Sequence, residues 1–158
     1  MIQIKKLNNS DFKLVENFII LEKKNFQFIT KLGWTDKNIQ LQLIKKNNLS
    51  IGFFDKNELI GILIAETIQQ LKSLDLEIHI IYISHKKRRK NAASKLLNYF
   101  EVNKKNLNLN NIYLEVAENN LPAIKLYEKN DFVFLKFRHN YYKYNNKMIS
   151  AKCYLKKL

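Results

Sequence analysis

Apolar residues recur at helical spacing in four segments of the chain. After Ser10 or Asp11, which can cap a helix, they form one stripe that ends near Lys23. Thr35 can cap a second helix. The four predicted helices run from residue 11 to about 23, from 36 to about 46, over 91–107, and from Asn119 or Asn120 to about 129. Pro122 lies in the first turn of the last one, where proline is tolerated.

Shorter apolar runs between these segments predict strands. They cover residues 3–7, 49–54, 59–70, 74–83, 111–116, 132–140 and 148–158. The polar stretch Asp55–Asn57 reads as a hairpin turn between two of them. This order predicts an α/β fold, with a mixed, largely antiparallel central sheet flanked by about four helices. Neither a linker nor a repeat interrupts it, so residues 1–158 are predicted to form one domain.

The composition narrows the class of protein. Hydrophobic residues make up 46% of the 158 residues, and no apolar run reaches the roughly 18 residues that span a bilayer, so no membrane partner is expected. The N-terminal residues lack the apolar segment of a signal peptide. A single cysteine, Cys153, cannot form an internal disulfide, which fits a reducing cytoplasm.

The formal net charge of +14 has two interpretations. It could mark a surface that faces nucleic acid or a ribosome. Alternatively, it reflects compositional drift, because 25 of the 28 basic residues are lysines spread along the chain, and asparagine and isoleucine are also abundant. We favour drift. Such a charge still attracts polyanions weakly and without specificity.

The basic segment His85–Lys90 follows a predicted strand and opens a predicted helix. A helix N-terminus presents unpaired N–H groups and the positive end of its dipole, which together favour a phosphate or pyrophosphate. The small residues Ala92 and Ala93 would let such a group approach the backbone. The alternative is a solvated basic turn before an ordinary helix.

A carboxylate and a phenol follow downstream. Glu115 lies in an otherwise apolar strand and shares its predicted face with Tyr113, although a half-solvated sheet face would explain it equally well. Asn120, Ala123 and Tyr127 share one face of the last helix. Core packing is the simpler explanation for Tyr127 alone. The pair would suit acyl transfer from a nucleotide thioester, with one group as a base and the other as an acid.

Residues 88–93, Arg-Arg-Lys-Asn-Ala-Ala, resemble the pyrophosphate loop Arg/Gln-x-x-Gly-x-Gly/Ala of the GCN5-related N-acetyltransferases (GNAT). Asn91 replaces the first glycine, and asparagine tolerates a left-handed backbone better than most residues. Residues 114–132 resemble the signature LEVR-x-SN-xx-AI-x-LYE-xx-GF of the bacterial ribosomal-protein alanine N-acetyltransferases, the RimI group. Ala117 replaces its arginine and Asp131 its glycine.

Two further segments resemble the same group. Residues 138–142, Arg-His-Asn-Tyr-Tyr, resemble its RxxYY segment, and Trp34-Thr35 resembles its PWS element. The resemblance implies an acetyl-CoA-dependent N-acetyltransferase, with Glu115 as general base and Tyr127 as the acid that protonates the departing thiolate. It implies acetyl-CoA contacts from a larger set: Ile81, Tyr82, Ile83, Arg88, Arg89, Lys90, Asn91, Ala92, Ala93, Ser94, Asn120 and Tyr127.

The acceptor implied by the resemblance is the α-amine of a protein N-terminus, in this group a ribosomal protein that begins with alanine. Trp34, Arg138, Tyr141 and Tyr142 would contact it. The three histidines and Cys153 have no metal-binding spacing, so no metal is expected. Two alternatives remain: the same fold acting on a small-molecule amine, and a non-catalytic basic module that binds RNA or the ribosome.

Overall fold

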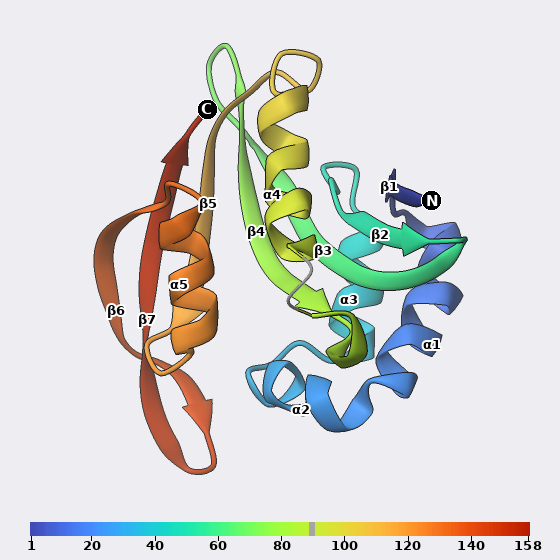
Figure 1. Ribbon diagram of the computed structural model, residues 1–158. Coiled ribbons are helices and arrows are strands. Elements are labelled where there is room, and N and C mark those ends of the chain that lie inside the picture. Colours follow the sequence, from blue (N-terminus) through green and yellow to red (C-terminus); the bar gives the residue numbers. More distant parts are fainter. Residues whose placement is uncertain (89–90) are drawn as a thin grey trace.

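The computed structural model describes residues 1–88 and 91–158. Its strands form one sheet in the order β1-β2-β3-β4-β5-β7-β6, in which only β4 and β5 run parallel (Figure 1). The strands are β1 (Ile2–Lys6), β2 (Ile51–Asp55), β3 (Glu58–Gln69), β4 (Leu74–Ile83), β5 (Leu109–Ala117), β6 (Val133–Tyr144) and β7 (Lys147–Lys157). The predicted mixed, largely antiparallel sheet is confirmed.

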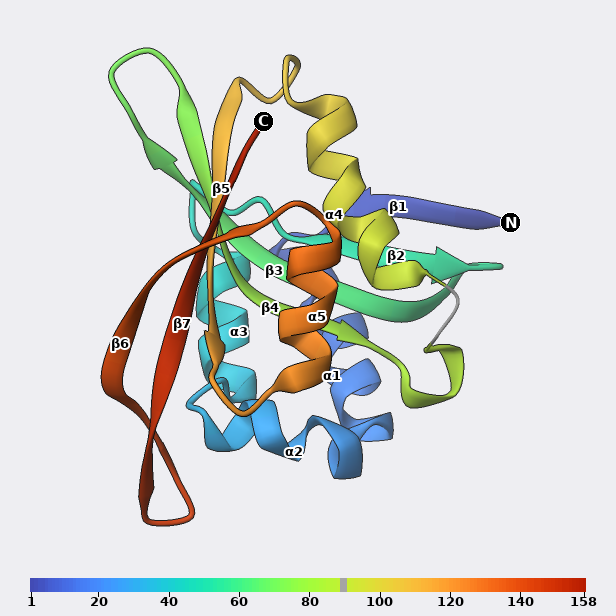
Figure 2. The same cartoon turned by 60° about the vertical axis from the view of Figure 1, so that its left-hand side comes forward.

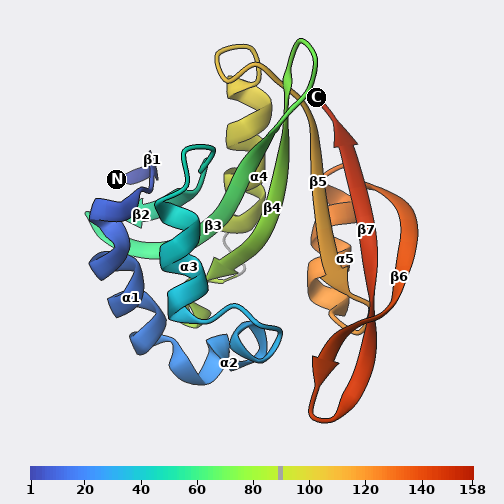
Figure 3. The same cartoon turned by 180° about the vertical axis from the view of Figure 1, so that it is seen from behind.

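Helices cover the two faces of this sheet unequally. They are α1 (Phe12–Leu21), α2 (Lys23–Lys31), α3 (Asp36–Leu43), α4 (Ala92–Asn103) and α5 (Leu121–Lys129), with short 3-10 turns at Asn9–Asp11 and His85–Lys87. Helices α4 and α5 lie on one face (Figure 1). Helices α1 to α3 lie on the other, over the half built from β1 to β4 (Figure 3). The β5–β7–β6 half therefore has helical cover on one face only.

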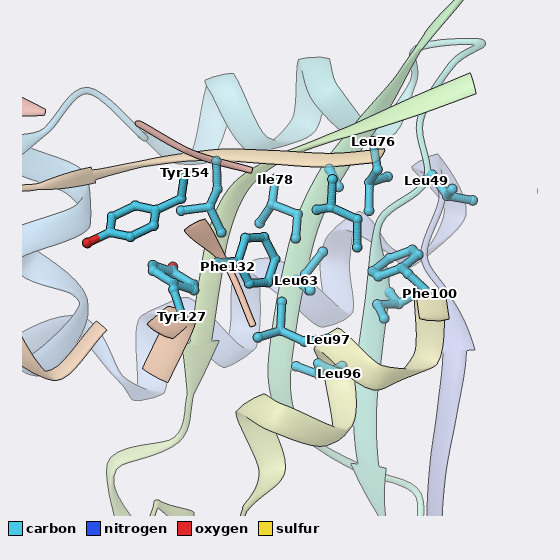
Figure 4. Close-up of a cluster of buried hydrophobic side chains, with 14 of the residues drawn as sticks. Leu49, Leu63, Leu76, Ile78, Leu96, Leu97, Phe100, Tyr127, Phe132 and Tyr154 are labelled. Atoms are coloured by element: carbon cyan, nitrogen blue, oxygen red, sulfur yellow. The ribbon is translucent and has the colours of Figure 1, made fainter. Parts of the chain in front are cut away.

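Two hydrophobic clusters hold these layers together. Strand alternation sends Leu63 to the α4 and α5 side, where it joins Leu96, Phe100 and Tyr127 (Figure 4). The neighbouring Ile62 points to the opposite side and packs in the cluster formed by α1 to α3. Full burial of each such aliphatic side chain is worth about 1.5–3 kcal/mol, so both helix layers are anchored through β3.

Strand β4 changes partner along its length. The parallel ladder with β5 runs from Leu74 to Ile78, which lies opposite Leu114, whereas β4 itself continues to Ile83 beside β3. Within the β3–β4 ladder, Ile64 pairs with Ile80 and Ala65 with Ile78, so His79 is an extra residue in β4. A bulge of this kind bends its strand. Strands β4 and β5 accordingly diverge beyond Ile78 (Figure 1).

Several local predictions are confirmed. Thr35 caps α3, and Asn120 caps α5 by accepting a hydrogen bond from the Ala123 N–H at 3.4 Å. The hairpin turn at Asp55–Asn57 is present, with φ of 48° at Lys56 and 70° at Asn57. Asp131, in place of the glycine of the resembled signature, has a left-handed φ of 64°.

Other predictions are wrong in detail. The first helix ends at Leu21, and a separate helix, α2, follows after Glu22 alone. Asp11 is the N-cap residue of α1, one of the two predicted, but its side chain makes no capping hydrogen bond to that helix. Asn8 caps the preceding 3-10 turn: its side chain accepts from the Ser10 N–H at 2.8 Å, while Asp11 accepts from the Asn8 N–H. The predicted helices over 36–46 and 91–107 end earlier, at Leu43 and Asn103.

None of the helices in residues 1–88 and 91–158 combines the length and apolar character needed to cross a membrane.

Candidate active site

A cavity of about 730 Å³ lies between the end of β4, the start of α4, helix α5 and helix α2. It is lined by Asn25, Phe28, Ile29, Ile81, Tyr82, Ile83, Arg88, Asn91, Ala92, Ala93, Ser94, Asn120, Pro122, Ala123, Leu126 and Lys129. Nine of the residues predicted to contact acetyl-CoA are among them. Arg89 and Lys90, also predicted there, lie outside the described residues. Figure 2 gives a second view of the β4 end and of α4 and α5, which form three sides of the cavity.

The N-terminus of α4 forms one end of this cavity. Asn91 has φ 58° and ψ 19°, a left-handed conformation that asparagine tolerates, just before the helix. Ala92 is buried against the core, and Ser94 accepts a hydrogen bond at 3.0 Å from the side-chain amide of Asn130, the residue that follows α5. The first N–H groups of α4, which have no partner within the helix, therefore start beside a cavity wall made of small side chains.

Arg88 lines the same end. Its Nε donates to the Ile83 carbonyl at 3.2 Å, and its guanidinium lies 5.1 Å from the centre of the Tyr82 ring. Burial, aided by the Glu22 carboxylate, raises the pKa of Tyr82, so this phenol stays neutral. The neutral ring holds the guanidinium through a cation–π contact. Arg88 thus places a positive charge near the N-terminus of α4, where the helix dipole is also positive.

Helix α5 contributes only part of its predicted face to the cavity. Asn120 and Ala123 line it, whereas Tyr127 does not. Tyr127 is 7% exposed and packs against the rings of Phe132 and Tyr154 in the core (Figure 4). Desolvation raises the pKa of Tyr127, which keeps its hydroxyl protonated at neutral pH.

Glu115 lies on the opposite face of the sheet from α5. Its neighbours Leu114 and Val116 point into the core beneath α4 and α5, so alternation turns Glu115 away from them. There it lines a second cavity of about 410 Å³, together with Asp75, Glu77 and Cys153 among others. The predicted base thus does not line the larger cavity. The two cavities lie on either side of the sheet. The larger one includes β4 residues beyond Ile78, and the smaller one lies over the part of the sheet where β4 and β5 are paired.

The predicted acceptor residues of β6 gather around Glu115. Arg138 Nη1 donates to Glu115 Oε1 at 2.6 Å, and the Arg138 guanidinium lies 3.9 Å from the centre of the Tyr141 ring. The Tyr141 and Tyr142 rings meet edge to face at 4.8 Å. Desolvation raises the pKa of Tyr142, and the charge of Glu115 adds to this, so its hydroxyl stays protonated at neutral pH.

Trp34 lies on the same side of the sheet but in a different group. Its ring lies 4.9 Å from that of His79, the extra residue of β4, whose Nε2 is 3.1 Å from Glu66 Oε1. Glu66, Glu77 and His79 bring three possible metal-ligand atoms within 4.8 Å of one another. The sequence spacing does not reveal this group. Glu66 also accepts from Lys45 Nζ at 2.9 Å. The expectation that no metal is required stays a prediction.

Helix α2 is the part of the site that sequence reasoning missed. Asn25, Phe28 and Ile29 line the larger cavity. The spacing of Phe26, Ile29 and Leu32 is helical and could have indicated a helix here. The tip of the β6–β7 hairpin contacts the same helix: the Phe28 and Tyr144 rings lie 5.1 Å apart, and Lys31 Nζ donates to Asn145 Oδ1 at 3.3 Å.

Comparison with known proteins gives one family. The model of the Acetyltransferase (GNAT) family matches residues 15–132. An N-alpha-acetyltransferase of Saccharolobus solfataricus is 42% identical over 78 residues, a match that spans 48% of this chain and 47% of the relative. This chain therefore aligns with about half the length of that curated relative.

The similarity to solved structures of the same fold covers nearly the whole chain. Arabidopsis thaliana NAA60 in complex with a bisubstrate analogue superimposes with a TM-score of 0.79 at 18% identity, covering 99% of this chain and 98% of NAA60. The ribosomal-protein-S18-alanine N-acetyltransferase of Escherichia coli gives 0.76 at 18% identity, with 99% and 94% covered.

The family model matches well over half of the chain, which is enough to assign the protein to a family. Residues 15–132 contain both diverging strands, the basic turn and the helices α4 and α5, which together form most of the larger cavity. The chain belongs to the acetyltransferase (GNAT) family, and its fold is that of these two solved structures. Membership supports an acyltransferase.

Proposed function

We propose that this protein transfers the acetyl group of acetyl-CoA to the α-amine of a protein N-terminus. The observation that carries the proposal is the cavity of about 730 Å³, in which β4 residues meet Arg88 and the start of α4. The residues fit the cosubstrate: small side chains, a positive charge and a helix N-terminus for the pyrophosphate, and an apolar wall for the pantetheine arm.

The free edge of β4 would hold the pantetheine arm. Beyond Ile78, β4 pairs with β3 but not with β5 among the described residues, although it continues to Ile83. Backbone N–H and C=O groups on that edge can therefore bind the amide groups of an extended ligand. An N–H group there could also polarise the thioester carbonyl as negative charge develops on its oxygen.

The chemistry needs one base and one acid. The α-amine, with a pKa of about 7.7–8.0, must be neutral before its nitrogen attacks the thioester carbonyl carbon. Glu115, directly or through water, would take the ammonium proton. A C–N bond forms and the C–S bond breaks. The second proton that the nitrogen must lose would also pass to Glu115, once the first has gone to solvent, while the thiolate of CoA takes a proton from Tyr127, whose phenolate then regains one from solvent. The raised pKa of Tyr127 is consistent with this role, because a donor must carry its proton beforehand.

Charge on the acceptor side supports an amine. Within a chain of formal net charge +14, the cavity of about 410 Å³ is lined by Asp75, Glu77 and Glu115, with Lys136 as a cationic neighbour. A cationic ammonium would be attracted to this lining despite the overall positive charge. Trp34, Arg138, Tyr141 and Tyr142 would contact the acceptor from β6 and from the segment between α2 and α3.

A peptide terminus is favoured over a lysine side chain by residues 138–142, which resemble the RxxYY segment of the ribosomal-protein alanine N-acetyltransferases. The Phe28–Tyr144 contact and the Lys31–Asn145 hydrogen bond join α2 to the β6–β7 hairpin that carries these residues. Two of the similar proteins, an N-alpha-acetyltransferase and a ribosomal-protein-S18-alanine N-acetyltransferase, agree by name with an N-terminal acceptor. A ribosomal protein beginning with alanine is the acceptor we propose, for a single-domain protein acting in the cytoplasm.

Turnover against matched acceptors tests this function. Release of CoA thiol should be fastest with peptides that carry a free N-terminal alanine. It should vanish when the same peptides are N-terminally blocked. Faster turnover with polyamines or amino sugars would instead indicate the small-molecule alternative. Binding of acetyl-CoA without any turnover, together with tight RNA binding, would indicate the non-catalytic module.

Charge reversal tests the cosubstrate site separately. Arg88→Glu should weaken acetyl-CoA binding in calorimetry by at least about tenfold, since it replaces attraction to the pyrophosphate with repulsion. Lys105→Glu makes the same change in net charge on an exposed residue just beyond α4, at the end far from the cavity. This control should bind acetyl-CoA nearly as the wild type does.

A further inference from the structure

The only residue between α1 and α2, Glu22, directs its carboxylate at the far end of β4. Oε2 accepts from the Tyr82 hydroxyl at 2.8 Å and from the His85 N–H at 3.0 Å, and Oε1 accepts from the Ser84 hydroxyl at 2.7 Å. Three donors from a four-residue stretch thus converge on one side chain 60 to 63 positions earlier in the sequence.

The backbone explains why Glu22 can do this. Its N–H donates to the Phe18 carbonyl at 3.1 Å and closes α1, while its own carbonyl accepts from the Asn25 and Phe26 N–H groups and starts α2. Its φ of −97° and ψ of 7° break the helix without a left-handed residue. The side chain is therefore fixed at a corner between two helices and has little freedom to leave β4.

The stretch that Glu22 holds leads directly into the basic turn. Ser84 and His85 precede Arg88, whose Nε donates back to Ile83 and whose guanidinium lies over the Tyr82 ring. Desolvation opposes ionisation of Glu22, but the hydrogen bonds from His85, Ser84 and Tyr82 and the charge of Arg88 prevail, and the pKa of Glu22 is lowered. At neutral pH the carboxylate is ionised and accepts all three bonds.

We propose that Glu22 is a positioning residue for acetyl-CoA: it fixes the start of the turn after β4 so that Arg88 and the α4 N-terminus meet the pyrophosphate together. This inference rests on the acetyl-CoA site proposed above. Glu22 acts through Tyr82, Ser84 and His85 and does not itself contact the cosubstrate.

The sign of the effect separates positioning from simple electrostatics. A carboxylate close to an anion site repels a pyrophosphate, so removing its charge alone should tighten binding. Removing a positioning carboxylate should weaken binding. Glu22→Ala is expected to raise the dissociation constant of acetyl-CoA about tenfold, the scale of lost hydrogen bonds to a charged group. Glu22→Gln keeps one acceptor oxygen, and its loss should be clearly smaller.

The location of the effect is equally specific. Strand β4 stays anchored by β3 and by the Tyr82 ring, which packs edge to face on Phe18 and Phe26. Turnover with S-acetylpantetheine, which lacks the pyrophosphate, should therefore change less than about twofold in Glu22→Ala. In an Arg88→Ala background, the tenfold loss from Glu22→Ala should shrink to below about threefold, because the two residues would serve one function.

The experiment is calorimetry of acetyl-CoA binding, with S-acetylpantetheine kinetics, for wild type, Glu22→Ala, Glu22→Gln and the Arg88→Ala pair. Glu16→Ala removes another α1 carboxylate, paired with Lys13, and should leave binding unchanged. Ser84→Ala, which removes one donor, should weaken binding about threefold if Glu22→Ala does not fold. Unchanged or tighter binding in folded Glu22→Ala would overturn the inference. A wild type that does not bind acetyl-CoA would overturn the proposed site instead.

Discussion

Arg138 and Glu115, 23 positions apart in sequence, form a 2.6 Å ion pair between β6 and β5. The pair joins a residue predicted to contact the acceptor to the residue predicted to be the base. Because β7 lies between these strands in the sheet, Arg138 reaches across β7 on the acceptor face. An ammonium group that approaches Glu115 would find this carboxylate already paired with the Arg138 guanidinium. The position of Arg138 therefore affects how an acceptor amine can reach Glu115.

Glu115→Gln should lower kcat by about 10²-fold, the low end for a positioned base. The loss should shrink as pH rises, since more of the α-amine is then already neutral. Kinetics between pH 6 and 9 with a saturating peptide check this. Glu101→Gln removes an exposed carboxylate that pairs with Lys156 and should retain wild-type kcat. If Glu115→Gln kept the wild-type kcat across this pH range, Glu115 would be a structural residue of the sheet and not the base.

Tyr127→Phe should lower kcat while acetyl-CoA affinity changes little, because the ring stays in the core and only the proton donor is lost. Tyr154→Phe is the matched control. Tyr154 is also buried, but its hydroxyl donates to Glu128 at 3.0 Å, so loss of this hydroxyl should cost about 1.5 kcal/mol of stability and leave kcat intact. Parallel melting curves and kinetics distinguish the two tyrosines. If Tyr127→Phe kept the wild-type kcat, Tyr127 would have a packing role only and would not be the proton donor.

Asn91→Gly should preserve or improve acetyl-CoA binding, and Asn91→Ala should weaken it. The left-handed φ of 58° suits glycine, whereas a Cβ without the polar side chain of asparagine costs about 1 kcal/mol or more there. Affinities and melting temperatures of the two variants provide the measurement. Equal affinities would mean that the turn tolerates another backbone conformation.

Gly61→Ala should disturb both stability and cosubstrate binding. A Cβ at Gly61 would lie 2.5 Å from Ile83 Cδ1 and 3.2 Å from the Tyr82 carbonyl oxygen, on the β4 segment that lines the larger cavity. Overpacking of this kind costs about 1–3 kcal/mol. Gly52→Ala meets Phe54 and Leu59 at 2.8 and 2.9 Å, away from that cavity, and should lower the melting temperature only. If acetyl-CoA affinity survives in Gly61→Ala, the β4 edge is not part of the site.

Features fixed by neighbouring residues could be predicted from the sequence. The buried stripe of α4, the left-handed Asn91 and Asp131, and the caps at Thr35 and Asn120 depend on local periodicity and backbone preference. Helix α2 was missed because the preceding stripe runs into it, and the break at Glu22 is stabilised by contacts with β4. Nothing local indicates such a break.

The arrangement of the site could be predicted only in part. Nine predicted acetyl-CoA contacts do line one cavity, because a strand, a turn and a helix that follow each other stay together. The opposite faces of Glu115 and Tyr127, the bulge at His79 and the Arg138–Glu115 pair depend on register between strands distant in sequence. A pattern within one strand gives its faces but not its partners.

The position of the acetyl group on a single acceptor tests the central claim most directly. A peptide with a free N-terminal alanine and one internal lysine is incubated with acetyl-CoA and the protein, and tandem mass spectrometry locates the added acetyl group. The account predicts label on the alanine α-amine, reduced with Arg88→Glu at acetyl-CoA concentrations below saturation and strongly reduced with Glu115→Gln. Label confined to the lysine side chain, or no label at all, would contradict it.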